Sequence, residues 1–162
     1  ERNVMAEVSL VRVDFRLVHG QVVVKWSKVA KATKIIVMND VIAADKTIKS
    51  VYKMAAPAGV KVLCYSLEKG MTKYKETQFG DGRAMVMFKD IKDCYRAWKA
   101  GFDMPKLQLG NCPRGADKKA LNNEVYATEE EIGLLKEMSA AGVDIVIHTI
   151  PEATCVSFDK VM

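Results

Sequence analysis

Residues 8–14 read VSLVRVD, residues 19–31 follow as an amphipathic segment, and Lys34–Met38 is the β-branched run KIIVM. The first and third stretches have the length and residue types of buried strands. The middle stretch carries apolar residues at the three- and four-residue spacing of a helix. The order strand, helix, strand predicts two parallel strands joined by a right-handed crossover.

The same alternation continues to the end of the sequence. Strands are predicted at 60–65, 83–88, 106–109 and 143–150, and helices at 44–56, 91–101 and 129–141, with a further helix capped by Ser66. Thr128 and Glu131 form the pattern of a capping box. The polar segment 110–124 is expected to be a long loop. The pattern predicts a single three-layer α/β/α domain over residues 5–162, with a mostly parallel, open twisted sheet. Residues 1–4 are expected to be a remnant of expression without a function.

Composition restricts the class of protein. The 162 residues are 49% hydrophobic and 28% charged, which is typical of a globular domain. The net charge of +5 suits anionic ligands or acidic partner surfaces, and the lysines are too dispersed to indicate nucleic-acid binding. No apolar run is long enough to span a bilayer, and no secretion signal is evident.

Cysteine and histidine usage gives little support for a metal site. The four cysteines are far apart, without a C-x-x-C pair, and only two histidines are present. This pattern fits a reducing compartment. Glycine-rich fingerprints for dinucleotides or nucleoside triphosphates are also missing. The sequence therefore predicts no cofactor and no metal.

The loop after the first strand, DFRLVHGQ, holds the candidate site. Ligands of open α/β sheets bind at the carboxyl ends of strands, where the strand order reverses. His19 precedes a helix whose first amides, at Gly20 and Gln21, favour an anion. Arg16 is suited to phosphate oxygens, and Asp14 is suited to hold one nitrogen of the His19 ring, leaving the other as a nucleophile. In the alternative interpretation, His19 is a structural residue of the helix start, and Arg16 and Asp14 form a surface ion pair.

The stretch RVDFRLVHGQV at residues 12–22 resembles the R-[IV]-D-x-R-L-[IV]-H-G-Q-V signature of the IIB subunits of the mannose/fructose/sorbose-type bacterial phosphotransferase system. The likeness continues through Lys25-Trp26, residues 35–40 (IIVMND), residues 54–62 (MAAPAGVKV), and Gly142-Val143 with the strand that follows and Pro151. The chain is therefore identified as a member of this family.

The resemblance implies a cytoplasmic phosphotransferase subunit that associates with a membrane transporter. His19 would accept a phosphoryl group from a phosphohistidine of the IIA protein or domain. It would pass the group to a sugar moved by the IIC and IID membrane subunits. Nδ1 would be the phosphorylated atom, with no metal or nucleotide taking part. Contact with the membrane is expected only through the transporter.

The segment Gly110-Asn111-Cys112-Pro113-Arg114 departs from the Gly-Gly pair common in the family. It is expected to face the site, where Arg114 would be either a second cation or a solvated arginine. His148 and Trp26 are expected to be structural. The competing functions are a non-catalytic module that binds a nucleotide or a sugar phosphate, and a regulatory phosphohistidine protein.

Overall fold

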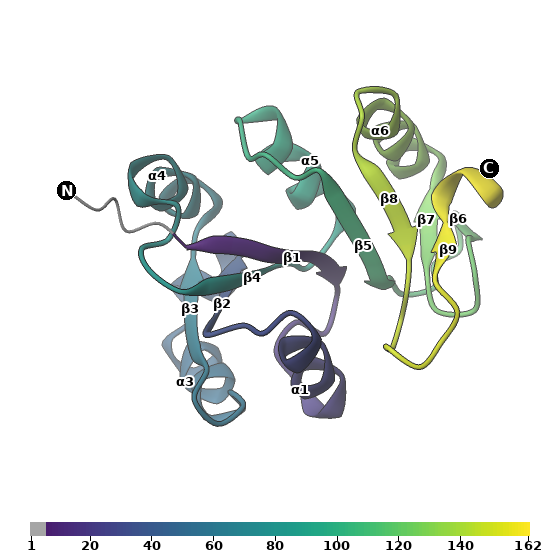
Figure 1. Cartoon of the computed structure of the whole chain (residues 1–162). Helices are drawn as coiled ribbons and strands as arrows, with labels where there is room; N and C mark the ends of the chain where they lie inside the picture. Colours follow the sequence, from purple (N-terminus) through teal and green to yellow (C-terminus); the bar gives the residue numbers. More distant parts are fainter. Residues whose placement is uncertain (1–5) are drawn as a thin grey trace.

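A seven-stranded sheet forms the middle layer of the molecule (Figure 1). In a computed structural model that describes residues 6–162, the strand order is β3-β2-β4-β1-β5-β8-β9. The strands are β1 (Glu7–Asp14), β2 (Lys34–Met38), β3 (Lys61–Tyr65), β4 (Arg83–Phe88), β5 (Lys106–Asn111), β8 (Asp144–Ile147) and β9 (Val156–Ser157). All neighbours pair in parallel except β8 with β9. Residues 1–4, expected to be a remnant of expression, lie outside the described residues.

Helices cover both faces of this sheet. They are α1 (Gly20–Val29), α2 (Asp40–Ala44), α3 (Lys46–Met54), α4 (Leu67–Thr77), α5 (Ile91–Lys99) and α6 (Glu129–Ala140), followed by the 3-10 turn η1 (Phe158–Lys160). Figure 1 shows α1 and α3 on one side of the sheet and α4, α5 and α6 on the other. The three-layer α/β/α architecture with a mostly parallel sheet confirms the predicted fold class.

Two apolar clusters hold the layers together because helices pack on both faces of the sheet. One cluster fills the space between the sheet and α4, α5 and α6, and includes Phe88, Leu107 and Leu135. The other lies under α1 and α3 and includes Trp26 and Ile35. The strands are apolar on both sides for this reason: every residue of β2 is buried.

The elements follow the sequence-based expectation closely, with three differences. The last core strand is shorter, Asp144–Ile147, and the chain then turns to form the antiparallel edge strand β9. A short helix, α2, begins directly after β2 because Asn39 caps it. The polar segment expected to be a loop begins with the last two residues of β5, and it contains β6 (Lys118–Ala120), which pairs with β7 (Tyr126–Thr128) in an antiparallel hairpin.

The path of the chain leaves one end of β1 open to ligands. β1 lies between β4 and β5, and the chain leaves β1 toward α1 on one face. After β4 the chain continues to α5, and after β5 it continues through the hairpin to α6; both helices lie on the other face. Connections that depart to opposite faces create the crevice in which open α/β sheets bind ligands. Among the described residues, no helix is long and apolar enough to cross a membrane.

Candidate functional site

The loop between β1 and α1 is a tight, partly strained turn. The amide of Leu17 donates to the carbonyl of Asp14 at 3.0 Å, which closes the turn. Leu17 has φ 54°, in the left-handed region, and its side chain is buried in the core under α1. A left-handed leucine costs about 1–2 kcal/mol. Its burial compensates for this cost and fixes where the following residues, Val18 and His19, leave the sheet.

Asp14 holds this turn from inside. Its side chain is buried at the end of β1, where Oδ1 accepts the backbone amide of Arg16 at 3.0 Å. Oδ2 accepts from the guanidinium of Arg12 at 3.2 Å. Asp14 accepts no hydrogen bond from the His19 ring, and Nδ1 of His19 has no partner among the described residues. The expectation that Asp14 holds a ring nitrogen is therefore wrong for this structure: the carboxylate orients the loop backbone and the arginines instead.

Arg12 is the central cation beneath the site. It is fully buried, and its guanidinium donates to the Gln108 side chain and to the carbonyls of His148 and Thr149, each of the latter at 2.8 Å. Burial lowers the pKa of Arg12, and the neighbouring Asp14 carboxylate opposes that shift. The guanidinium also lies 5.2 Å from the centre of the Trp26 ring. From the sequence, Arg12 was recognised only as part of the motif, and its role as the buried cation that joins these segments was not predicted.

Gly110 gives Arg12 its space. A Cβ at residue 110 would lie 2.1 Å from the guanidinium carbon of Arg12. The pairing of β1 with β5 shifts at this point, from Val13 opposite Leu109 to Asp14 opposite Asn111. The Asn111 carbonyl then accepts the amide of Phe15 at 3.0 Å. The predicted proximity of this segment to the site is confirmed, and the glycine that directly follows the predicted strand 106–109 was the signal that could have revealed space for a large neighbour.

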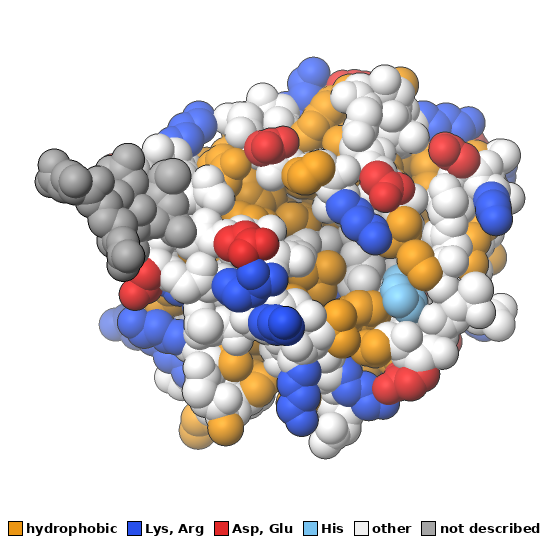
Figure 2. Space-filling model, in the orientation of Figure 1, with side chains coloured by type: hydrophobic (Ala, Val, Ile, Leu, Met, Phe, Trp, Pro, Cys, Tyr) orange, Lys and Arg blue, Asp and Glu red, His pale blue; other side chains and the backbone are white. Residues whose placement is uncertain are grey.

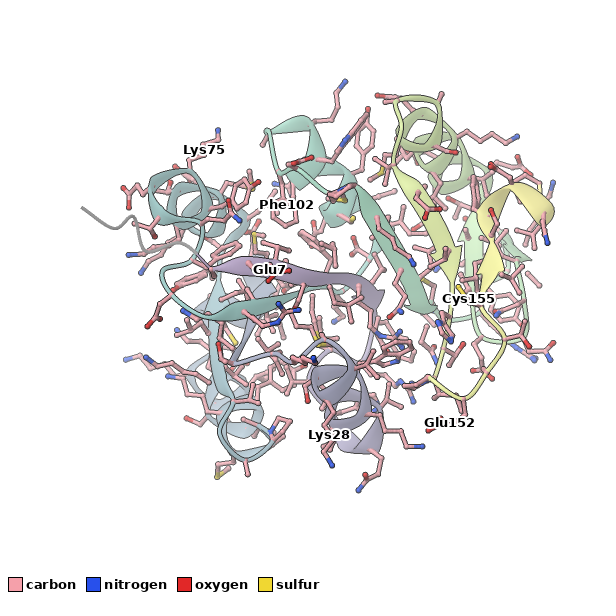
Figure 3. All side chains as sticks on the ribbon, viewed as in Figure 1. Glu7, Lys28, Lys75, Phe102, Glu152 and Cys155 are labelled. Atoms are coloured by element: carbon pink, nitrogen blue, oxygen red, sulfur yellow. The ribbon has the colours of Figure 1, made fainter. Side chains whose placement is uncertain are left out.

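The segment that follows β8 crosses over to α1. Besides the contacts to Arg12, the Thr149 carbonyl accepts from the indole of Trp26 at 2.9 Å. The His148 ring meets the Trp26 ring edge-on at 4.8 Å, and its Nε2 lies 2.9 Å from the Ala153 carbonyl oxygen. Glu152 pairs with Lys25 of α1 at 3.3 Å, and Figure 3 shows Glu152 in this turn beside α1. His148 is thus a structural residue of this segment, as the sequence suggested.

His19 is the N-cap of α1, at the open end of β1. Its backbone is extended, and its side chain, which is half-buried, makes no capping hydrogen bond. Gly20 follows with φ +56°, and a Cβ there would meet no atom within 4 Å. A left-handed residue followed by helical backbone turns successive amides toward one side, an arrangement that binds anions. The first turn, which includes the exposed Gln21, carries no acidic residue.

The arginines of the site differ in their attachment. Arg16 places Nε 3.6 Å from Oδ1 of Asp14, with its side chain 34% exposed and its guanidinium over the Phe15 ring at 5.9 Å. Its outer nitrogens are therefore available at the surface beside His19's loop. Arg114 is exposed and lies over the ring of Tyr126 at 5.3 Å, in the hairpin region. Of the two, Arg16 is the cation that the structure attaches to the candidate site.

These residues and this topology match a known family. The model of the "PTS system sorbose subfamily IIB component" family matches residues 8–162. The chain belongs to this family. The sorbose-specific EIIB component of Klebsiella pneumoniae is 31% identical over 96% of this chain and 95% of its own length. The fructose-specific EIIB component of Bacillus subtilis is 27% identical over 98% and 97% of the two chains.

Solved structures of the IIB family share the fold. The IIB domain of the K. pneumoniae sorbose permease superposes with a TM-score of 0.89 over 96% of both chains, at 31% identity. ManxB from Thermoanaerobacter tengcongensis gives 0.90 over 97% of this chain and 95% of its own, at 28% identity. The mannose-specific EIIAB component of Escherichia coli is 29% identical, and the match covers 44% of its length. As a IIB component of the phosphotransferase system, this protein is a phosphotransferase whose activity is phosphoryl transfer in sugar uptake.

Proposed function

We propose that His19 accepts a phosphoryl group from the phosphohistidine of a IIA partner and passes it to a sugar during uptake through IIC and IID membrane subunits. The observation that supports this most directly is the position of His19. It is the N-cap of α1 beside the acid-free first turn, with Nδ1 of its ring free of any partner among the described residues. A transferable phosphoryl group needs such a nitrogen lone pair.

Two substitutions at phosphorus make up the reaction. In the first, a ring nitrogen of His19 attacks the phosphorus atom, a new N–P bond forms, and the N–P bond to the donor histidine breaks. In the second, a sugar hydroxyl oxygen attacks phosphorus and an O–P bond forms; the N–P bond to His19 breaks, and the hydroxyl proton goes to the imidazole that is released. Negative charge spreads over the three equatorial oxygens in both steps.

The loop supplies the positive groups for those oxygens. The amides of Gly20 and Gln21 and the N-terminal end of the α1 dipole stabilise charge beside His19. Nε of Arg16 lies at ion-pair distance from Oδ1 of Asp14, 3.6 Å, without a hydrogen bond, and the outer nitrogens can contact phosphate oxygens. Asp14 acts by positioning Arg16 and the turn. Nδ1, the atom expected to carry the phosphoryl group, is shielded from solvent in this structure, so phosphorylation there requires the ring to turn about its side-chain bonds.

The partners follow from this chemistry. IIA must present its phosphohistidine to His19, and the IIC and IID subunits must present the sugar to the same group, so a site at the open end of a strand serves both. The mannose-specific EIIAB component of E. coli carries A and B components together, which supports a IIA partner. In this role, residues 5–162 act as one IIB domain at the cytoplasmic side of the transporter, without a cofactor.

Incubation with phosphorylated IIA tests the proposal. The chain should gain one phosphoryl group whose bond is labile in acid and stable in base. His19→Gln should remain folded and gain none, because the side chain makes no cap or ring hydrogen bond that folding needs. His148→Gln, which changes the only other histidine, should be phosphorylated normally. Phosphate uptake by His19→Gln equal to that of the unchanged protein would refute the assignment.

A further inference from the structure

Positive charge is divided unequally between the two helical layers. α1 and α3 carry five lysines and no arginine, aspartate or glutamate. α4, α5 and α6 together carry seven basic and seven acidic residues. The five lysines equal the net charge of the whole chain, +5. We call the surface formed by α1 and α3 the lysine face; its lysines are Lys25, Lys28, Lys46, Lys49 and Lys53.

Most of this charge is not neutralised. Lys28, Lys46 and Lys53 are exposed, and among the described residues none of them lies within ion-pair distance of a carboxylate. Lys25 pairs with Glu152. Figure 3 shows Lys28 projecting from α1 on the side away from the sheet, and Figure 2 shows blue side chains at the lower border over α1. The face therefore presents a positive potential to whatever approaches it.

Apolar side chains lie among these lysines. The described residues include five large exposed hydrophobic side chains, and three of them belong to α1 and α3: Val29 at 59% exposure, Val51 at 49% and Met54 at 79%. A hollow of about 550 Å³ lies beside them, lined by Val24 and Val60 and bordered by Lys28 and Lys31. Exposed apolar tips among cations are characteristic of surfaces that lie on a membrane interface.

We propose that the lysine face binds the surface of an anionic lipid bilayer directly. Juxtamembrane lysine clusters are attracted to anionic headgroups, and apolar tips can enter the interfacial region. Protein interfaces are instead depleted of lysine and enriched in arginine and aromatic residues, and α1 and α3 carry no arginine. A second copy of the chain would bring like charges together. This inference goes beyond the sequence-based expectation that the chain contacts the membrane only through the transporter.

Binding in this way leaves the candidate site open. Val29 and Met54 lie at the C-terminal ends of α1 and α3, whereas His19 precedes α1. Lys28 is nine residues beyond His19, or about 13 Å along the helix axis. A bilayer against the C-terminal halves of these helices therefore leaves the carboxyl end of β1 accessible from the side. The IIA partner can reach His19 in that orientation.

Sedimentation with lipid vesicles tests this proposal on the full chain. It should bind vesicles that contain phosphatidylglycerol, should not bind phosphatidylcholine alone, and should be released by salt because the attraction is screened. Lys28→Glu combined with Lys53→Glu should weaken binding by about tenfold or more. Lys75→Glu combined with Lys136→Glu makes the same change of net charge on exposed residues of the opposite layer, and should change binding by less than about twofold.

Several results would overturn the proposal. Failure to bind the anionic vesicles would do so, as would equal weakening by the two pairs of variants, which would indicate a diffuse effect of net charge. Binding to membranes that contain the transporter but not to protein-free anionic vesicles would assign the lysine face to an acidic protein. Phosphorylation of His19 by IIA in solution should be unchanged in the Lys28 and Lys53 variant, so this test and the test of His19 are independent.

Discussion

Arg12 and Asp14 form an ion pair at 3.2 Å, with 0% and 1% of their side chains exposed, although they are only two residues apart on β1. Residues two apart on a strand point to the same face, so the pair is a direct product of the strand conformation. The guanidinium continues to Gln108 of β5 and to the carbonyls of His148 and Thr149. One buried cation thus connects the loop that bears His19 to two other parts of the fold.

Replacing Arg12 by methionine should be strongly destabilising. The change leaves the Asp14 carboxylate buried without its buried cation and the His148 carbonyl without its donor, whereas the Thr149 carbonyl keeps the Trp26 indole; we expect a loss of about 3–5 kcal/mol. Arg12→Lys should lose less, because it keeps the charge while losing the planar fork. Urea unfolding of the three proteins measures the difference. A loss below about 1 kcal/mol for Arg12→Met would show that the pair contributes little to stability.

Gly110 and Gly133 give opposite expectations for the same substitution. Gly110→Ala places a methyl group against the Arg12 guanidinium and should destabilise the fold by about 1–3 kcal/mol or more. Gly133 is exposed in α6, where a Cβ meets nothing within 4 Å, so Gly133→Ala should stabilise by about 0.5–1 kcal/mol. Thermal unfolding measures both, and two changes of the same sign would contradict the geometry described for Gly110.

Gly20 is required for its backbone conformation rather than for space. With φ +56° and no neighbour near a Cβ, Gly20→Ala should cost about 1–2 kcal/mol of strain. Gly20→Asn should cost less, because asparagine tolerates the left-handed region. If the amides beside His19 bind the phosphoryl group, the rate of phosphate uptake should follow the same order, Gly, Asn, Ala. Equal unfolding free energies for the two variants would contradict the strain argument.

The buried thiol of Cys112 makes stability depend on alkaline pH. Burial raises the pKa of Cys112 from 9.0 to about 12. The unfolded chain therefore releases this proton near pH 9 while the folded chain retains it. Fewer protons on the unfolded state mean that stability falls as the pH rises, by about 1.4 kcal/mol per unit between pH 9 and 12.

Two cysteine variants isolate this contribution from other groups that titrate in the same range. In Cys112→Ala the unfolding free energy should fall less steeply as the pH rises: between pH 9 and 12 its slope should be smaller by about 1.4 kcal/mol per pH unit. Cys155→Ala, at an exposed position, should follow the unchanged protein. Denaturant titrations at several pH values measure the slopes. Parallel curves for Cys112→Ala and the unchanged protein would rule out a buried neutral thiol at this position.

The elements of the sheet were predictable because local signals agree with the global arrangement. Lys34–Met38 and Arg83–Phe88 have the bounds that their apolar runs predict, and Thr128 caps α6 with Glu131 in the capping box. Strand β9 and the hairpin of β6 and β7 were not predictable. Their strands have two or three residues, too few to show a period, and their pairing depends on segments distant in sequence.

The site was predictable in position but not in its internal contacts. The motif placed Asp14, Arg16, His19, Gly20 and Gln21 on one loop, and the loop lies where the chain leaves β1 toward the opposite face from its neighbours. Sequence proximity suggested that Asp14 would hold the His19 ring. Its partner is instead Arg12, because side chains on a strand alternate and a buried carboxylate requires the nearest buried cation.

The reach of Arg12 across the chain has a consequence for biosynthesis. The guanidinium and the Thr149 carbonyl that it binds are 137 residues apart. During translation the segment with Arg12 and His19 emerges from the ribosome early, and the carbonyls that accept from Arg12 emerge late. The loop around His19 therefore cannot adopt all of its native contacts until translation has passed β8. Nascent chains that stop before that point should fail to accept a phosphoryl group. The cell therefore gains an active subunit only after the strands of the sheet have been synthesised and paired.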